Sequence, residues 1–291
     1  MSLRSILTLS SSQAIDHTMS ASNRADILTK TAKVLKKHFK PAAPPSDRSV
    51  LEHLLYACCL ENSKHDVTDD VFAKLQESYY DWNEVRVTTI AELSEVMAPL
   101  NDPPQAANRL KRALQGVFEK YYSFDIDILR KGNLGKAVKD FESINGVTPF
   151  CVSYVAQNAL SGHSIPVNYG GFKLFIVLDV ITEAEASKGR IPGLERTVPK
   201  TKGVEFGSLL HQLAVDFGSS PHSPKVRSII LEIDPDAKDR LPKRATKKSE
   251  KKSAPKKSEK AKAAVKSGSA KKTAKSAKKA SSKGLAKKKP R

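Results

Sequence analysis

The last 49 residues carry the whole net charge of this chain and divide it into two parts. Residues 243–291 hold 21 of the 50 Lys and Arg residues but only two acids, Glu250 and Glu259, and so account for the formal charge of +19. The other 242 residues carry 29 basic and 29 acidic side chains. A balanced segment of that length can bury a core, whereas a polycation with almost no apolar residues cannot.

We therefore expect the tail, residues 243–291, to be disordered. It contains little beyond Lys, Ala, Ser, Pro, Gly and Thr, and its like charges repel one another. A polycation of this density attracts polyanions, of which nucleic acid is the most abundant, through counterion release that carries no sequence information. A solubilising or anionic-lipid-binding tail is the alternative. The tail lysines expected to contact DNA are Lys247, Lys248, Lys251, Lys252, Lys256 and Lys257.

The body, residues 1–242, contains the three cysteines, Cys58, Cys59 and Cys151, which are too few for a disulfide framework or a four-cysteine metal site. The apolar run at residues 5–9 is too short for a signal peptide, and no run is long enough to span a membrane. We therefore expect a cytosolic protein that does not insert into membranes.

Hydrophobic periodicity predicts an all-α class. Ser49 and Thr89 each stand three residues before a glutamate, which is the spacing of a capping box at the start of a helix. Only residues 85–87 suggest a strand. The predicted helices span residues 24–40, 50–60, 71–80, 90–98, 103–122, 125–130, 134–143, 151–160, 171–181, 204–217 and 224–231.

Residues 141–160 have the pattern of two helices joined by a tight turn at Ile144-Asn145-Gly146-Val147-Thr148-Pro149. Gly146 can adopt a positive φ without steric cost, Thr148 suits the N-cap, and Pro149 suits the first helical position. Such a turn directs backbone N–H groups outward and so offers a seat for a phosphate. An ordinary helical hairpin with no ligand is the alternative.

The turn resembles the Leu-Pro-Gly-Val-Gly hairpin of the helix-hairpin-helix DNA glycosylases, and most of all the endonuclease III branch. Ile165-Pro166-Val167-Asn168 resembles the stretch that ends in Val-Asp and carries the family's catalytic carboxylate. Residues 54–58 resemble the buried first helix, and residues 107–114 the helix after the first loop. The resemblance covers about residues 50–181 and implies two helical lobes with a DNA-binding cleft between them.

The resemblance also implies a domain arrangement. It consists of a flexible N-terminus (1–23), a helix and Pro-rich linker packing on the second lobe (24–49), a six-helix barrel-like lobe (50–162), a second lobe (163–242) and the tail (243–291).

The sequence departs from the family at the positions that carry its chemistry. The family's lysine nucleophile and catalytic aspartate are replaced by Phe150 and Asn168. Phenylalanine offers no amine for a Schiff base, and a neutral amide supplies no anionic field. Thr148 replaces the second hairpin glycine, and Pro149 removes one N–H donor. No cysteine follows Cys151, so the family's iron–sulfur loop is absent and we expect no cofactor.

Other constellations favour structural roles. Residues 65–70 combine a histidine with three aspartates, and we expect an exposed loop that caps a helix at Val71 rather than a metal site. Cys58 and Cys59 are expected to fill the core. Gly132-Asn133-Leu134-Gly135 is a poor match to a nucleic-acid GxxG loop. The aromatic residues expected to pack in the core or between lobes are Tyr79, Tyr80, Trp82, Tyr121, Tyr122 and Phe124.

The sequence thus predicts a monomeric DNA-binding protein with an endonuclease III-like body that has lost its catalysis and a histone-like tail that supplies non-specific affinity. The expected DNA contacts in the body are Asn145, Gly146, Val147, Thr148 and Lys173. One alternative is an active glycosylase and abasic-site lyase using displaced groups at Asp179, Lys173 or Glu183. Another is a scaffold that binds an unidentified protein while the tail holds DNA. We expect a nucleoid location in a bacterium or a nuclear one in a eukaryote.

Overall fold

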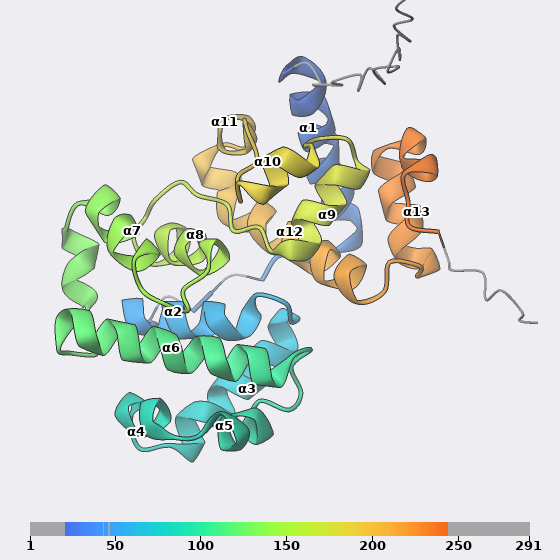
Figure 1. Ribbon diagram of the computed structural model, residues 1–291. Helices are drawn as coiled ribbons and strands as arrows, with labels where there is room; N and C mark the ends of the chain where they lie inside the picture. The colour runs from blue at the N-terminus through green and yellow to red at the C-terminus, as the bar shows by residue number, and fades with distance from the viewer. Residues whose placement is uncertain (1–20, 43, 46, 244–291) are drawn as a thin grey trace, which may run out of the picture. The chain divides into compact units, whose positions relative to one another are not determined.

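The computed structural model describes residues 21–42, 44, 45 and 47–243. The predictions for the tail, including its six named lysines, fall outside these residues. Within them every regular element is a helix, which confirms the all-α class (Figure 1). Residues 85–87, which suggest a strand in the sequence, lie in helix α4 (Trp82–Val87) instead. Asp81 caps that helix by accepting the Glu84 N–H, and this cap outweighs the strand preference of two valines.

One hydrophobic core gathers buried side chains from residues 50–159, and we call this region the first lobe. Both predicted capping boxes form, at Ser49 with Glu52 and at Thr89 with Glu92. Asp102 accepts the Gln105 N–H in front of a helix that begins with proline. Its helices besides α4 are α2 (Val50–Leu60), α3 (His65–Ser78), α5 (Ile90–Val96), α6 (Pro103–Tyr121), the 3-10 helix η1 (Asp127–Lys131), α7 (Leu134–Glu142) and α8 (Pro149–Asn158).

A separate core forms the second lobe, which joins the N-terminal helix to elements from the far end of the body. Helix α1 contacts α11, α12 and α13, so residues distant in sequence share one core (Figure 1). Helix α9 lies against α12 so closely that a Cβ on Gly170 would stand 2.2 Å from the Ala214 carbonyl oxygen. The elements are α1 (Ala21–His38), α9 (Tyr169–Val177), α10 (Glu183–Ser187), α11 (Leu194–Thr197), α12 (Lys200–Ser219), α13 (Pro224–Ile233) and η2 (Pro235–Asp239).

Two sequence expectations about exposure and loops are wrong. Residues 65–70 are the first turns of α3, not a loop, because Thr68 extends the buried stripe of Val71 and Leu75 back towards the start of the helix. Tyr80 is 97% exposed and Tyr122 is 81% exposed, so neither belongs to a core. The remaining four aromatic residues named above do pack against the first core. No helix in the described part of the chain is long and apolar enough to cross a membrane.

Candidate nucleic-acid interface

The hairpin turn between α7 and α8 has the local structure that its sequence predicts. Gly146 has a φ of 95°, which a side chain would disfavour. The Thr148 hydroxyl accepts the Cys151 N–H at 3.2 Å as the N-cap of α8, and Pro149 occupies the first turn. The three residues thus adopt their predicted roles, and the exposed Asn145 lies at the outer edge of the turn.

The same turn lies flush against α6 because glycines stand where the two segments meet. A Cβ on Gly146 would lie 2.4 Å from the Arg112 Cβ, and one on Gly116 would lie 2.4 Å from the Ile144 Cγ2. This close approach places the exposed Arg112 beside Asn145 on the wall of a surface groove of about 450 Å³. The groove is lined by two cations, Arg112 and Lys120, by one acid, Glu119, and by the outer edge of the hairpin.

Phe150, which the sequence comparison with the family predicts at the lysine position, is part of the core. Its side chain is 2% exposed, and its ring lies 5.4 Å from the His211 ring and 6.3 Å from the Tyr154 ring, measured between centroids. The ring thus joins α8 of the first lobe to α12 of the second. A lysine amine at this position would have to be buried, which is costly without a partner.

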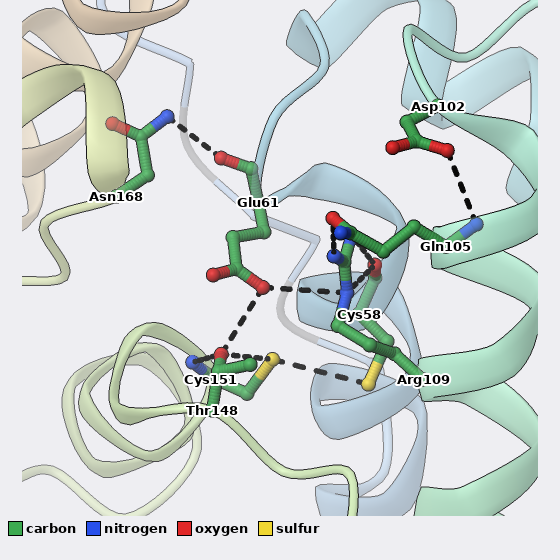
Figure 2. Close-up of polar contacts among 8 residues, drawn as sticks. All are labelled: Cys58, Glu61, Asp102, Gln105, Arg109, Thr148, Cys151 and Asn168. Carbon is green, nitrogen blue, oxygen red and sulfur yellow. Dashed lines mark hydrogen bonds and ion pairs between the residues drawn. The ribbon is translucent and has the colours of Figure 1, made fainter.

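Asn168, which the sequence comparison with the family predicts at the aspartate position, is 3% exposed and has a structural function. Its Oδ1 accepts the Gly171 N–H at 2.9 Å as the N-cap of α9, and its Nδ2 donates to the Glu61 carbonyl oxygen at 2.7 Å. Figure 2 shows the amide directed at Glu61. An amide can accept and donate at once, whereas an ionised carboxylate can only accept.

Glu61 is the residue on which both helix starts converge. Its carboxylate accepts the Thr148 hydroxyl at 3.1 Å and pairs with the Arg109 Nε at 3.3 Å (Figure 2). Arg109 also donates from its Nη2 to the Cys58 carbonyl oxygen at 3.1 Å. Burial raises the pKa of the Glu61 carboxyl above its usual value, and the Arg109 charge opposes that rise. Glu61 therefore has bonding partners in α6 and at the starts of α8 and α9.

The cavity beside Phe150 has a volume of about 30 Å³, which leaves room for only one or two water molecules. A larger groove of about 580 Å³ lies between residues of the two lobes beside Pro149, and Phe150 is not part of its lining. No lysine lines the cavity beside Phe150 among the residues that the structure describes. His211 in its wall is held neutral, because burial lowers the pKa of the imidazole to about 3. The cavity therefore has no lysine amine in its wall and no room for a nucleobase.

The displaced groups of the enzymatic alternative do not meet at this cavity. Asp179, Lys173 and Glu183 are absent from its lining. Lys173 is exposed on α9, where its Nζ lies 4.3 Å from the centroid of the Tyr169 ring. Glu183 lies in the short helix α10. The hairpin residues and Phe150 thus lie together at the start of α8, whereas Lys173 lies on an outer surface.

A four-iron cluster does not fit the cysteines that are present. Cys58, Cys59 and Cys151 are free and fully enclosed in the first core, and the Sγ atoms of Cys58 and Cys151 are 3.9 Å apart. A cluster of that type needs four thiolates, and this chain has three. In the described residues no group of three or more His, Cys, Asp or Glu side chains is arranged to hold a metal ion.

Sequence reasoning does not single out Glu61, Arg109, Arg112 or Tyr169. One signal was available for Arg109, since it lies on the face of α6 that also carries the buried Ala106, Leu110 and Ala113. A charge on an apolar helix face calls for a buried partner. The sequence offered no comparable signal for Tyr169, because its exposure depends on how α9 packs.

The fold has known counterparts. No protein-family model and no curated protein matches this sequence. Among solved structures, a non-covalent endonuclease III–DNA complex aligns with a TM-score of 0.51 and 14% identity, covering 77% of this chain and 99% of that one. A trapped endonuclease III–DNA covalent intermediate aligns with a TM-score of 0.50 and 14% identity, covering 77% and 100%.

The body therefore has the fold of the helix-hairpin-helix DNA glycosylases. Within that class it is similar to endonuclease III.

Proposed function

We propose that this protein binds DNA through an endonuclease III-like body that has lost the family's catalysis, and that the lysine-rich tail adds non-specific affinity. The observation that carries the proposal is the occupation of both catalytic positions by structural residues. Phe150 fills the core beside His211, and Asn168 caps α9 while it holds Glu61.

The loss of chemistry follows from the roles of these two side chains. A lyase of this type needs an amine that attacks the sugar and a carboxylate that stabilises positive charge. Restoring the amine at residue 150 would bury a charge, and restoring the carboxylate at residue 168 would remove the donor to the Glu61 carbonyl oxygen. The groups around both positions therefore fit Phe150 and Asn168 better than they would fit a lysine and an aspartate.

DNA binding by the body is supported by the hairpin. The turn leaves Asn145 exposed beside Arg112, and the two known structures most useful for comparison are both of endonuclease III with DNA. Because residues 1–242 are neutral overall, their contribution is local, and the tail supplies the long-range attraction.

Borohydride trapping on an abasic duplex tests the loss of catalysis. Residues 1–242, which lie within one compact unit, should give no specific covalent adduct, because no lysine lines the cavity at Phe150. Endonuclease III serves as the positive control. The full chain is run in parallel to measure background from the lysines of the tail.

A strong adduct from residues 1–242 would contradict the proposal and favour the enzymatic alternative. The variant Lys173→Gln then locates the amine. Loss of the adduct in that variant would assign the nucleophile to α9, and its persistence would point to another lysine of the body.

A further inference from the structure

We propose that Tyr169, together with Lys173, forms a stacking site for an unpaired nucleobase on the outer surface of the body. The inference rests on the proposed DNA binding and adds to it the chemical group that the body recognises. It also assigns the base to an external platform instead of an internal pocket.

Tyr169 presents its ring to solvent at the first position of α9. The residue is 67% exposed although its neighbours Gly170 and Gly171 are buried. Exposure alone does not make a site, since Tyr80 and Tyr122 are more exposed. Tyr169 differs from these two residues because it has a charged partner, Lys173, and because it directly follows Asn168.

The partner is Lys173, one helical turn further along α9. Its Nζ lies 4.3 Å from the centroid of the Tyr169 ring, which is within the range of a cation–π contact. No carboxylate within the described residues forms an ion pair with this lysine. The pair thus offers an aromatic face for a base and an unneutralised charge for the adjoining phosphate, which are the two elements of single-strand binding sites.

The pair is also linked to the hairpin through Asn168 and Glu61. Tyr169 directly follows Asn168, whose amide is bonded to Glu61, and the carboxylate of Glu61 is bonded to Thr148 of the turn (Figure 2). One peptide bond and two hydrogen bonds therefore connect the stacking residue to Thr148 of the turn. On this proposal, a nucleic-acid strand held at the turn extends to the ring of Tyr169.

The backbone next to Tyr169 is closely packed against α12. Gly170 lies against Ala214 of α12 with no space for a side chain, and Gly171 donates its N–H to the Asn168 cap. A fixed aromatic group loses little conformational entropy when a base stacks on it. The same packing keeps the ring of Tyr169 outside the core.

The cavity beside Phe150 is too small for a purine or pyrimidine, since its volume of about 30 Å³ holds only one or two water molecules. Stacking on the exposed ring of Tyr169 requires no opening of the lobes.

The test uses the full chain and a single-stranded oligonucleotide that carries one 2-aminopurine. The fluorescence of this base is quenched when it stacks, and a saturating protein concentration makes the quench independent of affinity. Neither the tail nor residues 1–20 contain Phe, Tyr or Trp, so they provide no ring to stack on. We expect quenching with the wild type and with Tyr169→Phe, and loss of most of it with Tyr169→Ala.

Tyr80→Ala is the matched control, because it removes another exposed tyrosine far along the chain and should leave the quench unchanged. At a fixed salt concentration Tyr169→Ala should weaken binding of the body, residues 1–242, by roughly 5- to 150-fold, the range measured for single base–aromatic stacks. Lys173→Gln should reduce the same affinity by a smaller factor.

Two results separate failure of this inference from failure of the proposed function. Full binding with equal quenching by Tyr169→Ala and the wild type would overturn the stacking site and leave DNA binding intact. Absence of any binding by residues 1–242, of either single-stranded or duplex DNA, would overturn both.

Discussion

Phe150 and Tyr169 lie just after the N-caps of two consecutive helices, α8 and α9, and both caps contact Glu61. Phe150 points into the core and is almost fully buried, whereas Tyr169 remains mostly exposed. The two aromatic residues therefore face different environments. The start of α8 contributes its ring to a filled core, whereas the start of α9 exposes a ring beside the charge of Lys173.

The largest expected contrast is in stability. Phe150→Ala should lower the free energy of unfolding by about 3–5 kcal/mol, because it removes a buried ring that packs on both Tyr154 and His211. Tyr169→Ala should change it by no more than about 0.5 kcal/mol, since the residue is mostly exposed. Chemical denaturation of both variants measures the difference, and equal losses would show that the two rings are not in contrasting environments.

The filled interior should also be sensitive to acid. Burial lowers the pKa of His211 to about 3, well below its ordinary value of 6.5. The unfolded chain therefore binds a proton at this residue more tightly than the folded chain does. Stability from the neutral imidazole is fully present above pH 6.5 and is lost as the pH falls towards 3, by an amount on the order of a few kcal/mol.

His211→Gln isolates this contribution, because glutamine can still donate to the Ser63 carbonyl oxygen that His211 contacts at 2.9 Å. Urea unfolding at pH 7, 5 and 4 should show a shallower loss of stability for the variant than for the wild type. Parallel curves for the two proteins would mean that His211 titrates normally in the folded state.

The sequence was a good guide where structure is decided locally. The capping boxes at Ser49 and Thr89 and the turn at Gly146, Thr148 and Pro149 form as predicted, because each depends on residues within a few positions of one another. The all-α class follows from the same local periodicity.

Prediction failed where distant contacts decide. Tyr80 and Tyr122 are exposed because no other element covers them, and the aspartates near His65 join a helix because Thr68 meets the core. The role of Asn168 depends on Glu61, which is 107 positions away in sequence. A single sequence identifies Asn168 as a departure from a motif but does not supply this partner.

The smallest expected effect concerns the junction between the two regions. Asn168→Ala removes the α9 cap and the hydrogen bond to the Glu61 carbonyl oxygen, and should lower the free energy of unfolding by about 1–2 kcal/mol. Asn168→Asp should cost at least as much, because it buries a charge and sets a carboxylate oxygen against the Glu61 carbonyl oxygen, although the α9 cap remains. Neither variant should gain a borohydride-trapped adduct, since Phe150 still occupies the amine position. If Asn168→Asp were more stable than the wild type and also formed an adduct, the site would accommodate a catalytic carboxylate. The contrast between a filled core and an exposed surface would then not hold at Asn168.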